Sequence, residues 1–413
     1  MRAVVGRVEG VRGELIPPPS KFFTQFSVAL ATVSEGRSEI RSPLSVGDTV
    51  CLLTSVEKLG GAARKGEGRW VIWGTAGRPS PSTGVLDAKN SATSLSLLSS
   101  ISALAGGTTV ITGDPQLRSR PLPELLLGLR RIGVSAFSTK ENDSPPFVIM
   151  RSSLRGGKVW LATPDKYLSS LILPCLFGEK EYRLVAVGGE RLRTAEEILK
   201  AAGVSIKSRG SSIEVPKQMP RGFKVTVPRD ADLLAPFAAL AILTDSRVQI
   251  RGEGRFLRLL KRLGLAVKVG GGKAKLEGPQ RPKPVRVDLS AAPEFFPLFC
   301  VLACFAKGTS VFFNLSHARR AKSDRVSVMV SSLQKMGAKI EGRRSEVLIR
   351  GPCALRGCEV DAGGDPCTAA ALLVAGALAE GKTTVRGVES LRVTYPNFLS
   401  SLRRLGVEIT LIS

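Results

Sequence analysis

An internal repeat is the feature of this sequence that most constrains its fold. An amphipathic stretch of about ten residues, followed by glycine and a short β-type run, occurs six times. Gly60 and Gly264 lie 204 residues apart, and so do Gly133 and Gly337. The remaining pair, Gly203 and Gly406, is separated by 203 residues. The chain therefore uses a set of three units twice, which predicts two similar domains.

A second element precedes each amphipathic stretch. It is an Ala- and Leu-rich segment followed by a small turn and a β-branched strand, as in SALAGGTTVIT at 102–112 and VAGALAEGKTTV at 374–385. Helices that are apolar on most faces are usually buried, and a glycine directly after a helix favours a left-handed C-cap. The sequence thus predicts an α+β fold with two similar domains, each built from three repeated βαβαββ-type units with buried helices.

Each predicted buried helix begins after a short polar segment, such as Pro19–Lys21 or Asn90–Thr93. A helix N-terminus carries unpaired N–H groups and partial positive charge, so it favours phosphates and carboxylates. Capping alone explains any one of these segments, but six of them favour an anion-binding role. The net charge of +25 also indicates anionic partners, although it is equally typical of a solvated basic surface.

Several classes of protein are disfavoured. The single histidine, His317, excludes a multi-histidine metal site. The longest apolar runs, 233–243 and 295–306, are shorter than the roughly 18 residues of a membrane-spanning helix. No apolar signal segment is visible at the N-terminus, and seven scattered cysteines fit free thiols in a reducing compartment. We therefore expect a cytoplasmic protein without membrane association.

Seven stretches in order along the chain carry a resemblance to a known family. They are PPPSK at 17–21, NSAT at 90–93, TGDPQLRSRPL at 112–122, PPFVIMRSSLRGGKV at 145–159, NLSHARRAKSDR at 314–325, SSLQKMGAKIE at 331–341 and TYPNF at 394–398. Together they resemble the 5-enolpyruvylshikimate-3-phosphate (EPSP) synthase, or 3-phosphoshikimate 1-carboxyvinyltransferase, family. The resemblance implies the enolpyruvyl transferase fold. It further implies one domain of residues 1–20 plus 226–413, a second of 21–225, and an active-site cleft between them.

The resemblance also implies an enzymatic activity. It is the transfer of the enolpyruvyl group of phosphoenolpyruvate to shikimate 3-phosphate, with release of phosphate, in the shikimate pathway of aromatic amino acid biosynthesis. The reaction needs no metal or organic cofactor. The implied partners are these two small anions, and we expect a monomer that does not act on nucleic acid.

The catalytic residues that the resemblance implies are Lys21, Glu294 and Lys322. Lys21 matches a lysine that contacts both substrates and can donate a proton. Glu294 occupies the position of a catalytic aspartate and is expected to act as the base. Lys322 is expected to stand in for a lysine that precedes the family's SDR segment.

The substrate-binding residues implied by the resemblance include Lys21 and six others. Arg120 and Arg325 match two arginines that bind phosphoenolpyruvate, for which a bidentate guanidinium is well suited. The other four are Asn90, Thr93, Lys166 and His317. Asp48 keeps an acidic position that is expected either to cap a helix or to brace a loop.

Other family positions have changed. Phe22 and Phe26 replace a serine and an arginine that hold shikimate 3-phosphate, and Ser96 replaces a second arginine. A Ser-Ser-Gln phosphate cradle reads Pro164-Asp165-Lys166. The expected Lys-Glu pair reads Ala321-Lys322, Asp-His-Arg reads 365-DPC-367, and a late lysine is Val393.

These changes leave alternatives open. A catalytically degenerate or repurposed family member would bind another anionic ligand in a more apolar pocket. A relative that transfers enolpyruvate to UDP-N-acetylglucosamine would need a reactive cysteine within 113–121, where none occurs. A role like that of RNA 3′-phosphate cyclase would suit the charge, but His317 would have to be its catalytic histidine.

Overall fold

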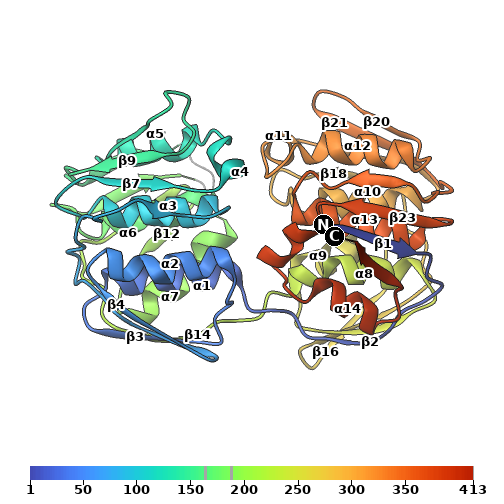
Figure 1. The fold of residues 1–413 in the computed structure, drawn as a ribbon, viewed down its shortest axis with the longest axis horizontal. Coiled ribbons are helices and arrows are strands. Elements are labelled where there is room, and N and C mark those ends of the chain that lie inside the picture. The colour runs from blue at the N-terminus through green and yellow to red at the C-terminus, as the bar shows by residue number, and fades with distance from the viewer. Residues whose placement is uncertain (162–164, 187–188, 413) are drawn as a thin grey trace. The chain divides into compact units, whose positions relative to one another are not determined.

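The computed structural model describes residues 1–161, 165–186 and 189–412, without the side chains of Lys166 and Arg262. The chain forms two compact units (Figure 1). Unit 1 comprises Met1–Pro18 and Arg229–Ser413, and unit 2 comprises Pro19–Pro228. The chain thus changes units after Pro18 and after Pro228, where the sequence placed the changes after residues 20 and 225.

Unit 2 contains three four-stranded sheets. The first has the order β14 (Lys224–Thr226), β3 (Arg37–Arg41), β5 (Arg69–Trp73), β4 (Ala62–Gly66). The second has the order β6 (Leu86–Asp87), β7 (Thr109–Thr112), β9 (Phe147–Met150), β8 (Ser135–Ser138). The third has the order β10 (Gly157–Trp160), β11 (Tyr182–Val185), β13 (Ser212–Val215), β12 (Lys207–Arg209).

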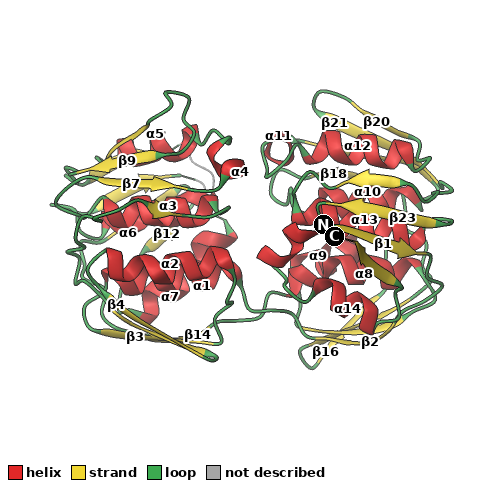
Figure 2. Ribbon diagram, in the orientation of Figure 1, coloured by secondary structure: helices red, strands yellow, loops and turns green. Residues whose placement is uncertain are grey.

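Most helices of unit 2 lie between the sheet that contains β7 and β9 and the sheet that contains β3 and β4 (Figure 2). Three of them are the predicted apolar helices: α1 (Lys21–Val33), α3 (Ala92–Ser102) and α6 (Asp165–Cys175). α3 packs against both α1 and α6. The others are α2 (Gly47–Lys58), α4 (Pro115–Arg118), α5 (Pro123–Arg131) and α7 (Glu190–Ala201). Side chains from the apolar helices form much of a core cluster that also takes in strands of all three sheets.

Unit 1 repeats this arrangement. One sheet has the order β16 (Val267–Gly270), β17 (Lys273–Glu277), β15 (Arg247–Arg251), β2 (Arg12–Leu15). The next has the order β18 (Arg286–Asp288), β19 (Gly308–Phe313), β21 (Glu346–Gly351), β20 (Ile340–Gly342). The last has the order β22 (Glu359–Asp361), β23 (Lys382–Arg386), β1 (Arg2–Gly6), β24 (Ile409–Ile412).

The apolar helices of unit 1 are α8 (Ala235–Leu243), α10 (Phe296–Cys304) and α13 (Pro366–Leu378), and each contacts the other two. Around them lie α9 (Arg255–Arg262), α11 (Ser316–Arg319), α12 (Arg325–Lys335) and α14 (Phe398–Arg404), with two 3₁₀ turns, η1 (Ala231–Leu234) and η2 (Val388–Val393). The core cluster of unit 1 is separate from that of unit 2. The predicted α+β fold with buried helices is confirmed.

All six sheets share one topology. An edge strand runs parallel to its neighbour, and the remaining two pairings are antiparallel, as in β14–β3–β5–β4 and β18–β19–β21–β20. The N-terminal segment completes two sheets of unit 1, because β2 pairs with β15 and β1 pairs with β23 and β24. The two ends of the chain therefore lie side by side, with Arg2 opposite Ile412 (Figure 1).

The six repeat glycines end six helices, as predicted. Each follows the C-cap residue of α2, α5, α7, α9, α12 or α14, and each has a positive φ, from 75° at Gly264 to 101° at Gly406. The next residue donates its N–H back to the helix, for example Val134 to Leu129 O at 2.9 Å. This is the hydrogen bond of a Schellman motif. Among the described residues, no helix is both long and apolar enough to cross a membrane.

Candidate active site

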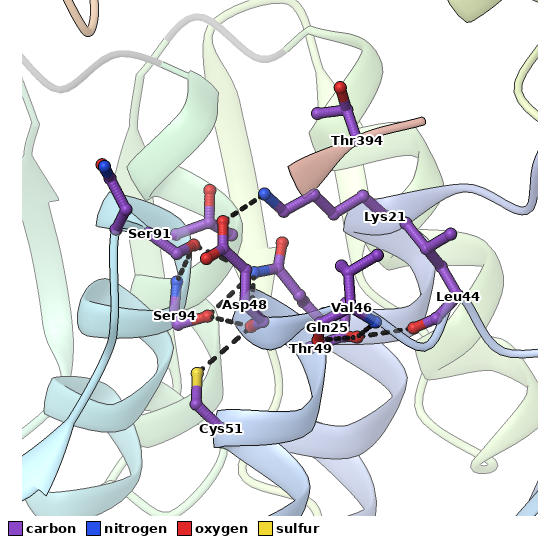
Figure 3. Close-up of polar contacts among 12 residues, drawn as sticks. Lys21, Gln25, Leu44, Val46, Asp48, Thr49, Cys51, Ser91, Ser94 and Thr394 are labelled. Atoms are coloured by element: carbon purple, nitrogen blue, oxygen red, sulfur yellow. Dashed lines mark hydrogen bonds and ion pairs between the residues drawn. The ribbon is translucent and has the colours of Figure 1, made fainter. Parts of the chain in front are cut away.

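Lys21 is the first residue of α1, and a buried carboxylate holds its side chain. Ser20 caps the helix by accepting a hydrogen bond from Phe23 N at 3.3 Å. Lys21 Nζ forms an ion pair with Asp48 Oδ2, and the two side chains are 18% and 3% exposed (Figure 3). Asp48 lies in the first turn of α2, where the helix dipole favours a negative charge. Asp48 therefore braces Lys21.

Gln25, one turn further along α1, joins three helix starts. Its Nε2 lies 2.8 Å from Ser94 Oγ, 3.0 Å from Ser91 Oγ and 3.3 Å from Asp48 O (Figure 3). Ser94 Oγ also donates to Asp48 O at 2.7 Å. All four residues are buried, so this network fixes the starts of α1, α2 and α3 relative to one another. The sequence did not single out Gln25.

Asn90 and Thr93 lie at the start of α3, and both have polar partners. Asn90 Nδ2 donates to Gln116 Oε1, and Thr93 Oγ1 accepts from Arg191 Nη1 at 3.1 Å. Arg191 lies in the first turn of α7 and was missed at the sequence level. The sequence did contain one indication of Arg191. A cation in the first turn of a helix is unfavourable because it opposes the helix dipole, and residues that depart from such local rules tend to lie at functional sites.

The two phenylalanines of α1 differ in their surroundings. Phe26 is 0% exposed and belongs to the core cluster of unit 2, with its ring centroid 5.9 Å from that of Phe22. Phe22 is half-buried, and the Arg191 guanidinium lies 5.1 Å from its ring centroid. Phe26, at the position of an expected arginine, is therefore a core residue and offers no group to an anion. Phe22 instead supports a cation through its ring face.

Asp165 and Ser96, two further changed positions, have structural partners. The Asp165 carboxylate accepts hydrogen bonds from the backbone of Gly189, Arg191 and Leu192 at 2.9–3.1 Å, so it caps α7. Ser96 is fully buried and hydrogen bonds to Ser170 of α6. The side chain of Lys166 lies outside the described residues.

Arg120 follows the short helix α4 and is half-buried. Asp114 caps α4 by accepting from Leu117 N at 2.8 Å, and Arg120 N donates to Leu117 O at 3.1 Å. The TGD…RPL segment thus forms a capped turn that fixes the backbone of the predicted phosphoenolpyruvate-binding arginine.

Arg325 is the most enclosed of the predicted cations in unit 1. Its Nε donates to Asp365 Oδ2 at 2.9 Å, and its Nη1 donates to Pro293 O at 3.3 Å. Its side chain is 11% exposed, and that of Asp365 is 0% exposed. Asp365 Oδ1 caps α13 through Cys367 N at 2.8 Å and Thr368 N at 3.2 Å. One carboxylate therefore fixes both the helix start and the arginine.

Glu294 directly follows Pro293 and precedes α10. Its Oε1 accepts from Arg255 Nη2 at 2.5 Å, and Arg255 Nε donates to Asp232 Oδ2 at 2.9 Å. Arg255 begins α9 and was not predicted from the sequence. The predicted base therefore has a cationic neighbour that is itself held by a second carboxylate.

Lys322 and His317 lie in the segment that holds α11. His317 is exposed, and Lys322 is half-buried in the loop between α11 and α12.

Cys367, in the first turn of α13, replaces an expected arginine. Burial raises the pKa of its thiol to about 12, although the Arg325 charge acts in the opposite direction. Cys367 is therefore uncharged at neutral pH and does not replace the lost cation.

Each unit offers a distinct chemistry. In unit 2, two cations, Lys21 and Arg191, lie at helix starts that also favour anions. In unit 1, a rigidly held arginine, Arg325, contacts the backbone of Pro293, and the next residue, Glu294, carries a carboxylate that can accept a proton. The described residues contain no group of three or more His, Cys, Asp or Glu side chains placed to hold a metal ion.

Comparison with known proteins gives full-length matches. The family model for EPSP synthase (3-phosphoshikimate 1-carboxyvinyltransferase) matches residues 5–402. The 3-phosphoshikimate 1-carboxyvinyltransferase of Methanosarcina acetivorans is 32% identical over 433 residues, covering 100% of both chains. The enzyme of that name from Methanococcus aeolicus is 27% identical and covers 99% of each chain.

Solved structures with the same fold include two transferases. The EPSP synthase of Acinetobacter baumannii superposes with a TM-score of 0.83 at 22% identity, over 99% of this chain and 100% of that one. The enolpyruvyl transferase NikO from Streptomyces tendae gives a TM-score of 0.81 at 17% identity, over 99% and 98% of the two chains.

Proposed function

Because the chain belongs to the EPSP synthase (3-phosphoshikimate 1-carboxyvinyltransferase) family, we propose that it transfers the enolpyruvyl group of phosphoenolpyruvate to the 5-hydroxyl of shikimate 3-phosphate. Phosphate is the second product. The observation that carries this proposal is the Arg325–Asp365 ion pair, because Arg325 also donates to the backbone oxygen of Pro293 and so lies one residue from Glu294 in unit 1. A carboxylate-binding cation and a proton acceptor are the groups that this reaction requires.

The proposed roles follow from the chemistry of each group. Glu294 accepts the proton of the attacking hydroxyl as its oxygen bonds to C2 of phosphoenolpyruvate, and Lys21 or Lys322 supplies a proton to the methylene carbon. The C2–O bond to phosphate then breaks while the new methyl group returns one proton to the protein, which restores the double bond. Arg120 and Arg325 bind the anionic groups of phosphoenolpyruvate. A guanidinium suits this task because its paired N–H donors match a carboxylate or a phosphate.

For shikimate 3-phosphate we propose contacts from Lys21, Asn90 and Thr93, with Lys166 and His317 as further candidates. Arg191 is added because its guanidinium already contacts Thr93 Oγ1 and the face of Phe22. Through this contact it supplies a positive charge at the start of α3, the helix in which the expected arginine is replaced by Ser96. We expect the protein to act as a cytoplasmic monomer on these small anions.

The role of Arg191 can be tested by Arg191→Met, with the exposed Arg193 of the same helix as the matched control. Loss of one charged contact to a bound anion costs about 2 kcal/mol at the low end, which corresponds to roughly a 30-fold rise in KM for shikimate 3-phosphate. Arg193→Met is expected to change KM by less than twofold. Equal effects of the two changes would remove Arg191 from the proposed contacts.

The proposed activity is tested by phosphate release from the purified chain with both substrates. Lys21→Ala should lower kcat by about 10²–10⁴ if Lys21 takes part in proton transfer. The exposed Lys58, at the end of α2, serves as the control, and its change to alanine should leave kcat intact. Turnover by the unaltered chain no greater than that of Lys21→Ala would refute the proposal.

A second candidate is enolpyruvyl transfer to a different anionic acceptor. It is favoured by three positions at which the expected arginine is replaced by an uncharged side chain without exposed polar function: core Phe26, buried Ser96 and protonated Cys367. Phosphoenolpyruvate binding by calorimetry, combined with no phosphate release when shikimate 3-phosphate is added, would select this candidate. Turnover with shikimate 3-phosphate would reject it.

A further inference from the structure

Three side chains of unit 1 form a charge-alternating chain that leads to Glu294. Asp232 lies in η1, Arg255 begins α9, and Glu294 precedes α10. Their side chains are 15%, 31% and 32% exposed. Because all three lie within unit 1, their geometry depends on that unit alone.

Asp232 anchors the chain and divides its two oxygens between backbone and side chain. Oδ1 accepts from Phe256 N at 3.1 Å, and Oδ2 accepts from Arg255 Nε at 2.9 Å. The backbone makes this approach possible, because a Cβ on Gly254 would lie 2.3 Å from Asp232 Oδ1. Any larger residue at position 254 would push the carboxylate away from the start of α9.

Arg255 is consequently held on three sides. Its Nε is bound by Asp232, its Nη2 by Glu294, and its Cζ lies 5.5 Å from the ring centroid of Phe295. A planar guanidinium that already forms an ion pair with Asp232 and a contact with an aromatic ring has little conformational freedom left. Its second ion pair, to Glu294, therefore costs little further side-chain entropy. This rigidity is passed on to Glu294 through the contact to Oε1.

Glu294 needs such support because of its length. The resemblance places an aspartate at this position, and glutamate has one more rotatable bond. Ordering a long polar side chain costs up to about 2 kcal/mol of rotamer freedom, and a misplacement of about 1 Å in a reacting group can cost about 10²-fold in rate. Arg255 occupies Oε1, and Oε2 has no hydrogen-bond partner within the described parts of the chain.

We propose that Arg255 is a positioning residue that fixes the Glu294 carboxylate through Oε1 and leaves Oε2 to accept the substrate proton, with Asp232 as its anchor. This inference rests on the proposed function, in which Glu294 is the base. It adds a residue that touches neither substrate and that acts only through Glu294.

The test compares Arg255→Met, Glu294→Gln and the double variant with the unaltered chain. Arg258→Met is the matched control, since Arg258 lies on the same helix and is exposed. We expect Arg255→Met to lower kcat by about 10- to 100-fold, with less than a threefold change in either KM. In the Glu294→Gln background the same change should cost less than threefold, because the group it positions is gone.

Two results would overturn the inference. One is an Arg255→Met variant with the kcat of Arg258→Met. The other is an equal loss of kcat in the presence and absence of Glu294, which would indicate a general structural role. Arg255→Lys distinguishes positioning from an effect on folding. If the role is positioning, the lysine should keep an ion pair to Glu294 and give a higher kcat than Arg255→Met, although the two variants have the same melting temperature.

Failure of the proposed function gives a different result. If the unaltered chain shows no turnover, the base assignment of Glu294 falls, whereas crystal structures of the unaltered chain and Arg255→Met still test the positioning. We expect the Glu294 carboxylate to be ordered in the first and to occupy several rotamers in the second. A single unchanged rotamer in both would overturn the positioning role.

Discussion

Asp365→Asn isolates the charge of the most enclosed ion pair of unit 1. Asparagine is as good an N-cap as aspartate, so the hydrogen bonds to the start of α13 are expected to persist. What disappears is the negative charge that faces Arg325 Nε at 2.9 Å. Arg325 is then left as an enclosed cation without its counter-charge.

The expected loss follows from the burial of the two groups. Removing one partner of a buried ion pair typically costs about 3–5 kcal/mol, and the residual 11% exposure of Arg325 favours the lower end, about 3 kcal/mol. For a domain of about 200 residues each kcal/mol lowers the melting temperature by about 2–4 °C. The transition of unit 1 should therefore shift down by roughly 6–12 °C.

Differential scanning calorimetry measures this shift directly. Asp361→Asn is the matched control, because Asp361 pairs with Arg386 at 3.3 Å with both side chains about half exposed. Exposed pairs contribute at most about 1 kcal/mol, so this change should shift the transition by no more than about 4 °C. Equal shifts for the two variants would refute the reasoning that burial makes the Arg325–Asp365 pair strong.

Three further outcomes follow from described contacts. Gly133 and Gly406 have similar φ values of 97° and 101°, but a Cβ would lie 2.1 Å from Ser153 O at Gly133 and meet nothing within 4 Å at Gly406. Alanine should therefore cost about 1–2 kcal/mol at Gly406 and clearly more at Gly133, and equal losses in urea unfolding would contradict this. Ser96→Arg introduces the arginine that the family resemblance implies at this position. Because the site is fully buried, the variant is expected to unfold unit 2, and a soluble variant with an unchanged melting temperature would contradict this expectation. A hydrogen bond from the Cys304 thiol lowers the pKa of Cys353 to about 6. The rate at which iodoacetamide alkylates Cys353 should therefore rise with pH through about 6 and level off by pH 8. A midpoint near 8.5, measured by peptide mapping, would contradict the lowered pKa.

Local features of the chain were predictable from the sequence. The repeat glycines predicted the helix ends correctly. A left-handed residue after the C-cap depends only on the local backbone conformation, so this feature can be inferred without knowledge of the tertiary structure. The buried helices were predictable because their residues are apolar on almost every face. For the same reason the sequence could not say which face of α1 is solvated, and it did not indicate that Phe26 lies in the core whereas Phe22 is only half-buried.

Contacts between distant segments were not predictable in the same way. Arg255 is separated from Glu294 by 39 residues, and Arg191 from Thr93 by 98. No periodicity links such pairs, because they meet only once the helix starts have been brought together by the sheets. Lys21, Glu294 and Arg325 were found through family resemblance, whereas the partners that hold them, Asp48, Arg255 and Asp365, became evident only from the three-dimensional structure.

The pairing of β1 with β23 and β24 has a consequence for synthesis on the ribosome. Unit 2 is one continuous segment, so it can fold as soon as Pro228 has left the exit tunnel. β1 and β2 are made before unit 2, yet β15, β23 and β24 all follow unit 2 in the chain. β1 and β2 must therefore wait, unpaired, until the part of unit 1 that follows unit 2 has been made. During that interval their strand edges are open to wrong partners, so unit 1 is more exposed to misassembly during synthesis than unit 2.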